Sequence, residues 1–104
     1  MSTPSYTKQP TETRTYDVTF LSLLVTGETV SSVDSVTQRV MDPVTGARTA
    51  TTDLTIVGNT LVTPVVSVQL SGGVEGVLYD VTVEVTASNG DIIEQQFRLY
   101  VTDL

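Results

Sequence analysis

The sequence contains no cysteine, no histidine and no tryptophan. Without cysteine, the chain can form neither a disulfide bond nor a thiolate metal site. Without histidine, it lacks the usual general base and the commonest transition-metal ligand, so catalysis by a Ser-His-Asp triad or a Cys-His pair is excluded. These absences indicate that the protein is not an enzyme, and we expect no catalytic, cofactor-binding or metal-binding residues.

Basic residues are scarce as well. Five Lys and Arg stand against twelve Asp and Glu, which gives a formal net charge of −7. The basic residues are scattered along the chain: Lys8, Arg14, Arg39, Arg48 and Arg98. Because binding to phosphates requires clustered Lys and Arg, nucleic acid is not expected as a partner. An acidic surface favours a partner with a basic face.

Long apolar runs are also absent, and none approaches the length of a membrane span. Residues 1–15 are polar, contain two prolines and lack the apolar region of a signal peptide. We therefore expect no membrane contact and a chain that stays, or is assembled, in the cytoplasm. We interpret residues 1–15 as an extended N-terminal arm outside the core, and residues 16–104 as a single domain.

Threonine and valine make up more than a third of the chain. β-branched side chains suit a pleated sheet better than a helix, and no segment has sustained helical periodicity. The sequence therefore predicts an all-β fold. The expected strands before the last hairpin are Tyr16–Val25, Glu28–Val40 with a bulge near Val33–Val36, Leu54–Val57 and Thr63–Leu70. Met41–Asp53 is expected to form a long hairpin-like excursion. Short strands separated by regular turn signals are typical of an antiparallel β-sandwich.

The clearest pattern is a hairpin formed by Tyr79–Ala87 and Ile93–Val101. Both segments alternate apolar and polar residues, which predicts one face in the core and one in water. Asn89-Gly90 suits a two-residue type I′ turn. That turn would place Ser88 opposite Asp91, Glu84 opposite Gln95, Asp80 opposite Leu99, and Glu94 opposite Val85. The expected core includes Val66, Val68, Leu70, Tyr79, Val81, Val83, Phe97 and Leu99.

Tyr79 follows a glycine-rich turn formed by Gly72, Gly73 and Gly76. A tyrosine at this place can form a tyrosine corner, in which its hydroxyl bonds the backbone a few residues upstream. An ordinary, partly buried tyrosine explains the sequence equally well, and the residues alone do not decide between the two.

Carboxylates are the remaining candidates for chemistry. Glu84 and Glu94 lie on the outward face of the last hairpin, which favours a solvated strand face over a catalytic carboxylate pair. Asn89 and Asp91 are better explained as turn residues than as calcium ligands, because NGDIIE is poor in oxygen ligands. The LSGGVEG segment after Gln69 does not match a phosphate-binding loop.

An exposed aromatic platform would indicate carbohydrate binding. Tyr100 lies on the outward phase of the last strand and is one candidate, although a single ring is not a platform. A carbohydrate-binding or adhesin-type module therefore stays an alternative function for a sandwich of this kind.

The last third of the chain resembles the phage fibre–tail adaptor proteins, a family of small virion proteins. The residues that carry the resemblance are Leu70, Ser71, Gly72, Gly73, Gly76, Tyr79, Val81, Thr86, Gly90, Leu99 and Val101. Tyr16, Asp17, Phe20 and the segment Gly27–Ser32 extend it more loosely toward the N-terminus. The family often has tryptophan in the first strand, whereas Phe20 and Leu24 stand near that place here.

The resemblance implies an immunoglobulin-like or fibronectin-like sandwich in a bacteriophage tail. It implies a non-enzymatic structural protein that is part of the virion and is assembled in the host cytoplasm. Its partners would be other virion proteins of the tail, neck or fibre, and copies of itself. No small-molecule substrate is expected. The arm and the excursion Met41–Asp53 have no evident role in a core, so we expect both to contact neighbouring subunits.

Overall fold

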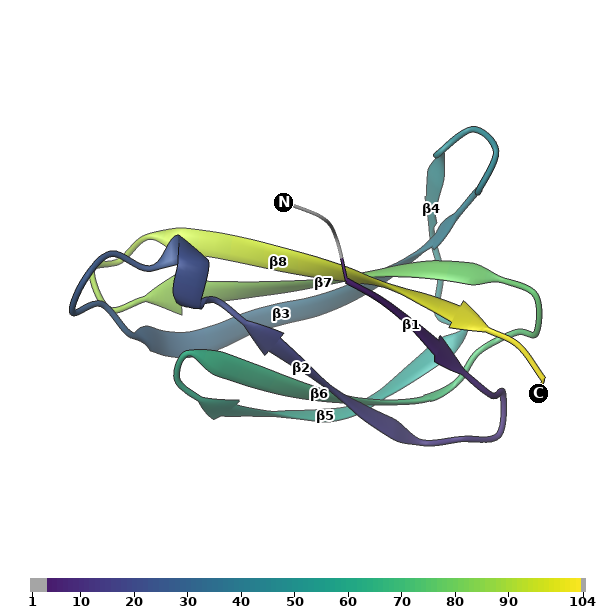
Figure 1. Cartoon of the computed structure of the whole chain (residues 1–104), viewed down its shortest axis with the longest axis horizontal. Helices are drawn as coiled ribbons and strands as arrows, with labels where there is room; N and C mark the ends of the chain where they lie inside the picture. The colour runs from purple at the N-terminus through teal and green to yellow at the C-terminus, as the bar shows by residue number, and fades with distance from the viewer. Residues whose placement is uncertain (1–3, 104) are drawn as a thin grey trace.

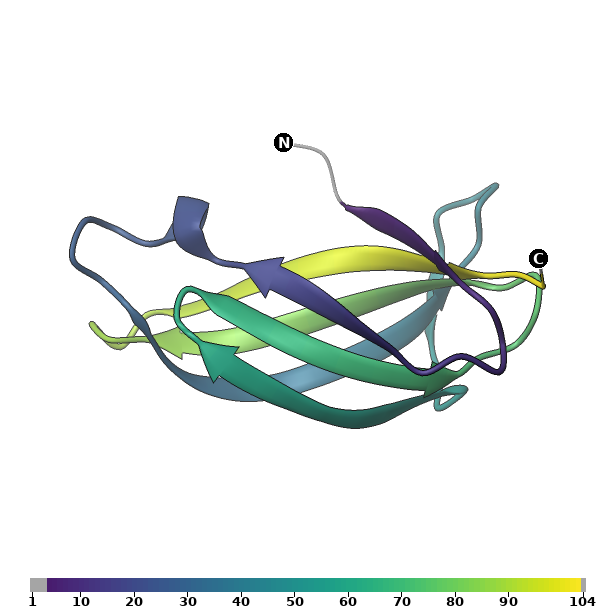
Figure 2. The same ribbon diagram turned by 60° about the horizontal axis from the view of Figure 1, so that its bottom comes forward.

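The computed structural model describes residues 4–103, which form two stacked β-sheets (Figures 1 and 2). Five strands form one sheet in the order β1 (Ser5–Lys8), β8 (Ile92–Val101), β7 (Leu78–Ala87), β3 (Val30–Met41) and β4 (Arg48–Ala50). Three strands form the other, in the order β2 (Arg14–Thr19), β6 (Val65–Gly72) and β5 (Leu54–Val62). The predicted all-β fold is confirmed.

A single 3₁₀ turn, η1 (Leu21–Leu23), is the only helical segment within residues 4–103. It follows β2, which ends at Thr19 and not at Val25 as predicted. No helix in this part of the chain has the length and apolarity needed to span a membrane.

The core lies between the two sheets. All eight residues predicted for it have at most 1% of their surface exposed. Tyr16, Phe20, Val85 and Val101 join them in the same buried cluster. Alternation along β6, β7 and β8 places these side chains on the inner faces of the sheets. Burying one such side chain contributes about 1.5–3 kcal/mol to the stability of the fold.

Around Asp80 and Thr82, β7 is buried on both faces, which the sequence did not predict. Asp80 and Thr82 belong to its outward phase, yet only 3% and 8% of their surfaces are exposed. β7 is the middle strand of the five-stranded sheet, so its outward side chains have neighbours on both sides. Thr37 and Gln96 flank Thr82 in register, and an arginine from β4 covers Asp80.

The predicted pairing of the last hairpin is wrong by one residue. Thr86 pairs with Ile92 and Glu84 pairs with Glu94, so the loop between the strands is longer than two residues. A type I′ turn needs positive φ at both central positions, but only Gly90 has it there, at 94°. The amide of Gly90 donates to the carbonyl of Ala87, as in a type I turn followed by a left-handed glycine.

The N-terminal segment is not an arm outside the core, at least from Ser5 onward. Residues 5–8 form β1, which pairs in parallel with β8 of the same chain, and Arg14 begins β2. The side chain of Tyr6 also packs on Tyr16 and Phe97, with ring centroids 5.0 and 5.7 Å apart. A polar strand can join a sheet because the backbone supplies the hydrogen bonds. Whether residues 16–104 fold without this strand stays a prediction.

The middle of the chain agrees with the sequence in outline. β3 has register shifts at Val30/Ser32 and Val33/Ser35, which confirms the predicted bulge. Met41–Asp53 forms a hairpin with β4 that projects from one end of the molecule (Figure 1). β5 is longer than predicted: it continues past Gly58, where the pairing with β6 shifts, and ends at Val62.

Candidate interaction surfaces

Glu84 and Glu94 face each other across β7 and β8 on the outer face of the five-stranded sheet. Glu94 is exposed and Glu84 is half-buried. On β3, the other neighbour of β7, Ser35 pairs with Glu84. Within residues 4–103, no group of three or more acidic side chains is arranged to hold a metal ion. The two carboxylates therefore add negative charge to an open sheet face.

Asp80, which was predicted to face solvent, is instead part of the structure. Its Oδ2 accepts a hydrogen bond from Nε of Arg48, while its Oδ1 is buried without a hydrogen-bond partner in the described structure. Arg39 and Arg98 stand beside Asp80 on the neighbouring strands. Arg48 alone contacts the buried carboxylate within the described residues, and the Asp80–Arg48 pair fastens the β4 hairpin to the middle of the sheet.

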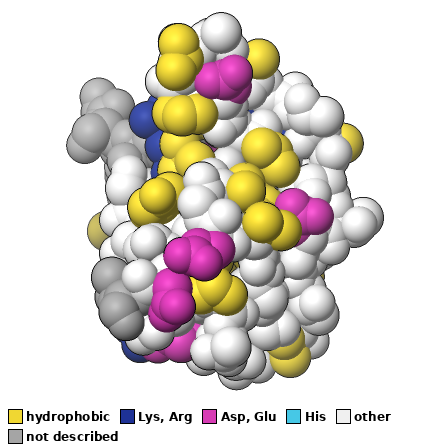
Figure 3. Space-filling view, turned by 90° about the vertical axis from the view of Figure 1, so that its right-hand side faces the viewer, with side chains coloured by type: hydrophobic (Ala, Val, Ile, Leu, Met, Phe, Trp, Pro, Cys, Tyr) yellow, Lys and Arg dark blue, Asp and Glu magenta, His cyan; other side chains and the backbone are white. Residues whose placement is uncertain are grey.

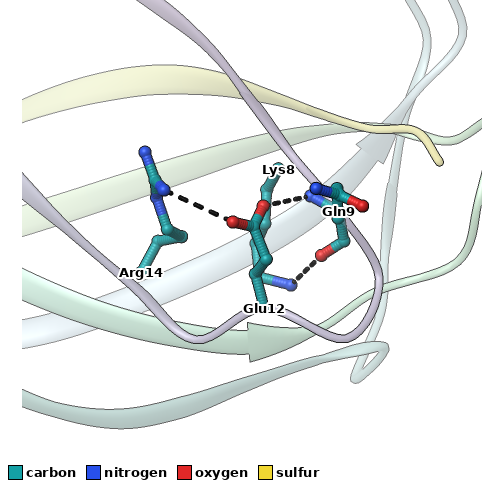
Figure 4. A network of polar contacts seen from close by, with 4 residues as sticks. All are labelled: Lys8, Gln9, Glu12 and Arg14. Carbon is teal, nitrogen blue, oxygen red and sulfur yellow. Dashed lines mark hydrogen bonds and ion pairs between the residues drawn. The ribbon is translucent and has the colours of Figure 1, made fainter. Parts of the chain in front are cut away.

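Lys8 is a buried cation that the sequence did not single out. Only 1% of its surface is exposed, and its Nζ donates to the carbonyl oxygens of Gln9 and Gly72, both at 2.7 Å. Burial lowers the pKa of Lys8, and the nearby carboxylate of Glu12 opposes that effect. Glu12 also accepts hydrogen bonds from the amide of Gln9, at 2.8 Å, and from Arg14, at 3.3 Å (Figure 4). This network fixes the turn between β1 and β2.

Tyr79 makes the backbone contact expected of a tyrosine corner. Its hydroxyl accepts a hydrogen bond from the amide of Val74 at 2.8 Å, five residues upstream. The same hydroxyl donates to Oδ2 of Asp53 at 3.0 Å. Burial raises the pKa of Tyr79, although the bond from Val74 works against the rise. One side chain thus holds both the glycine-rich crossing and the segment before β5.

The polar groups of Asn89 and Asp91 bond each other. The amide of Asp91 donates to Oδ1 of Asn89 at 2.9 Å, and Nδ2 of Asn89 donates to Oδ2 of Asp91 at 3.0 Å. These contacts are those of a turn, as the sequence predicted. Tyr100 lies on the outer face of β8 with 42% of its surface exposed.

Charge is distributed unevenly along the strands. We call the half of the molecule that contains the β7–β8 turn and η1 the acidic half. All five basic side chains lie in the opposite half. Arg39 and Arg98 pair with Asp80 near the start of β7, and Lys8, Arg14 and Arg48 lie at that level of the strands or farther from the β7–β8 turn. The acidic half contains carboxylates alone, namely Asp17, Glu28, Asp34, Glu84, Asp91 and Glu94.

The opposite half is mixed. Figure 3 views the molecule from that end and shows acidic and hydrophobic side chains among neutral ones, with basic side chains at the margin. The two ion pairs recorded within residues 4–103, Arg14–Glu12 and Arg48–Asp80, both lie in this half. Negative charge is thus partly compensated here and not in the acidic half.

A hollow that no sequence pattern predicted lies at the tip of the acidic half. Its apolar lining comes from η1 and the following loop, through Leu21, Leu24 and Val25, and from Pro64 in the β5–β6 turn. Glu28 is the one charged residue among those that line it. Leu21 and Val25 have 68% and 64% of their surfaces exposed. The segment was interpreted as strand, so this concave surface could not be expected.

Comparison with models of known protein families finds a match. The model of the family described as podophage GP4 fiber-tail adaptor protein gp77 matches residues 8–100. The matched range includes β2 to β7 entirely and nearly all of β8. No curated protein and no solved structure matches the chain.

Proposed function

The chain belongs to this family of podophage fibre–tail adaptor proteins, and from that membership we propose that it joins fibres to the tail of a phage particle. The match over residues 8–100 is the observation that carries the proposal, because it spans both sheets. The protein acts through surface contacts with other virion proteins and with copies of itself. It is assembled in the host cytoplasm and becomes part of the virion.

We also propose that the chain has no catalytic, cofactor-binding or metal-binding residues. Its carboxylates support this view. Asp80 and Asp53 are engaged by Arg48 and Tyr79, and Asp91 is bonded within a turn. Glu84 and Glu94 lie on an open sheet face, which does not enclose a substrate between the two carboxylates.

An immunoglobulin-like arrangement is the finer fold assignment that we propose. The strand order supports it, since β2, β6 and β5 would take positions B, E and D, while β3, β7 and β8 would take C, F and G. Tyr79 near the start of β7 corresponds to the tyrosine of strand F. In this arrangement residues 16–104 form the body of one domain, and the residues before them add β1, which docks on β8, and the first two residues of β2.

The adaptor role is tested on purified particles from phage that carry or lack the gene for this chain. We expect the protein at a fixed copy number in wild-type particles by quantitative mass spectrometry. Particles without it should have tails without fibres by electron microscopy. Absence of the protein from wild-type particles, or normal fibres on particles that lack it, would contradict the proposed function.

A further inference from the structure

Glu28 is the one charged residue that lines the hollow at the tip of the acidic half. Oε1 of Glu28 accepts a hydrogen bond from the amide of Val25 at 3.2 Å, so the side chain is held in place. Its Oε2 is buried and has no hydrogen-bond partner in the described structure. A buried polar atom without a partner is costly, so a turn of the Glu28 carboxylate that lets this oxygen accept from a donor in the hollow would be favoured.

Two segments line the hollow: η1 with the loop after it, and the β5–β6 turn. Leu21 and Val25 are exposed and Pro64 is half-buried, while Thr26, Thr29 and Thr63 add polar groups to the lining. Hydrogen bonds hold the two sides together: the amide of Phe20 donates to the carbonyl of Pro64 at 2.9 Å, and the amide of Val30 donates to Oγ1 of Thr63 at 2.9 Å. The hollow is therefore built from fixed elements, and its lining combines apolar side chains, threonines and one carboxylate.

Lysine and arginine combine an aliphatic stem with a cationic head. Such a side chain could place its stem against Leu21, Val25 and Pro64 and donate from its head to Oε2 of Glu28. A charge-assisted hydrogen bond of this kind is stronger than a neutral one. The surrounding carboxylates of the acidic half would also attract a basic partner, since no basic side chain of this chain lies there to compensate them.

We infer that this hollow is a docking site for a lysine or arginine side chain on a different virion protein. The inference rests on the proposed function, and it specifies which end of the molecule is used and the chemistry of the partner. A second copy of this chain is a poorer occupant. Its Lys8 is buried, and its Arg14 and Arg48 are already paired with carboxylates. Arg39 and Arg98 are the remaining basic side chains of such a copy, and they lie on the outer face of the five-stranded sheet beside the buried carboxylate of Asp80.

The test uses particles that lack this chain, from a phage with a nonsense mutation in its gene. Purified wild-type chain is added, and bound copies are counted by mass spectrometry over a range of concentrations. Glu28→Gln preserves the shape of the side chain and an oxygen that can accept from Val25. We expect it to raise the half-saturating concentration at least tenfold, which corresponds to about 1.4 kcal/mol. Leu21→Ala should weaken binding as well, because it removes part of the apolar wall.

Two matched variants at the opposite end serve as controls. Glu75→Gln makes the same change in charge on an exposed loop residue, and Val74→Ala shortens a side chain with 50% of its surface exposed. Both should bind like wild type. Added salt should weaken wild-type binding more than binding of Glu28→Gln, because one ion pair is missing in the variant.

Binding of Glu28→Gln and Leu21→Ala at wild-type strength would overturn the docking site and leave the adaptor role intact. Failure of the wild-type chain to bind the particles would instead count against the adaptor role, and the docking site would fall with it. Sedimentation of the purified chain tests whether a second copy of the chain occupies the hollow instead. Self-association that Glu28→Gln abolishes would assign the hollow to a second copy and overturn the inference.

Discussion

The ammonium group of Lys8 donates a 2.7 Å hydrogen bond to the carbonyl oxygen of Gly72, a residue 64 positions away. Lys8 ends β1 in the five-stranded sheet, and Gly72 ends β6 in the three-stranded sheet. This bond therefore joins the two sheets at one end of the sandwich. It also explains how a polar N-terminal segment is held against the core.

Lys8→Met tests this contact. Methionine keeps much of the stem but removes the donor from the carbonyls of Gln9 and Gly72, so we expect the free energy of unfolding to fall by about 1–3 kcal/mol. Denaturant unfolding measures the change. Arg14→Met is the control: its ion pair is exposed, and its loss should cost less than about 1 kcal/mol. Equal effects of the two variants would contradict a special role for Lys8.

Lys8 should also contribute to the pH dependence of the free energy of unfolding. Because burial lowers the pKa of Lys8, the unfolded chain binds more protons than the folded chain between that lowered pKa and the ordinary value of 10.5. Stability should therefore rise with pH as 10.5 is approached from below. Unfolding curves from about pH 7 to 10 should show this contribution in wild type and not in Lys8→Met. Parallel pH profiles for the two proteins would contradict it.

Tyr79→Phe tests the tyrosine corner. The variant leaves the amide of Val74 and Oδ2 of Asp53 without the hydroxyl, which should lower the free energy of unfolding by about 1–3 kcal/mol. Because burial raises the pKa of Tyr79, its contribution is complete below the ordinary value of 10.0 and is lost as pH rises toward the raised pKa. The difference between wild type and variant should thus shrink above about pH 10, as unfolding curves would show.

Two glycines of the crossing between β6 and β7 form a matched pair. Gly73 and Gly76 both have positive φ, at 99° and 83°. A Cβ at Gly73 would lie 2.8 Å from Cγ2 of Val101 and 3.1 Å from Cδ2 of Leu54, whereas one at Gly76 would meet nothing within 4 Å. Gly76→Ala should cost about 1–2 kcal/mol from backbone strain alone. Gly73→Ala should cost about 1–3 kcal/mol more because of overpacking. Thermal or denaturant unfolding would rank the two.

Phe97→Ala tests the centre of the core. The ring is 1% exposed, and its centroid lies 5.4 Å from that of Tyr16 and 5.7 Å from that of Tyr6. Its removal should lower the free energy of unfolding by about 3–5 kcal/mol. Tyr100→Ala on the outer face of the same strand is the control and should have a much smaller effect. A small loss for Phe97→Ala would mean that the core collapses around the missing ring.

Much of the fold could be predicted because alternation reports which side chains face the core. The same alternation contained the correct hairpin register. Val81 and Phe97 were both placed inward, and residues directly opposite each other in an antiparallel pair share a face. The two-residue turn suggested by Asn89-Gly90 would have placed Glu84, which points outward, opposite the inward Gln95. The requirement that paired residues share a face of the sheet therefore determines the register here, and the two-residue turn that Asn89-Gly90 favours does not form.

Other features could not be predicted from local pattern. β1 has few apolar residues, and its place beside β8 depends on pairing with residues more than ninety positions away in sequence. Asp80 is buried because Arg48 reaches it from the β4 hairpin. The hollow depends on where the loop after η1 meets the β5–β6 turn. Each of these features is a long-range contact that the periodicity of one segment does not contain.

The uneven charge along the strands affects how the protein approaches a charged partner. The molecule is 42 Å long and carries its uncompensated carboxylates toward one end, so it behaves as an electric dipole with its negative pole at the β7–β8 turn. A positively charged surface would rotate the protein before the two make contact. At physiological salt this torque acts only over roughly 8 Å, the Debye length. The alignment would therefore occur in the last step of encounter, after diffusion has brought the two surfaces close together.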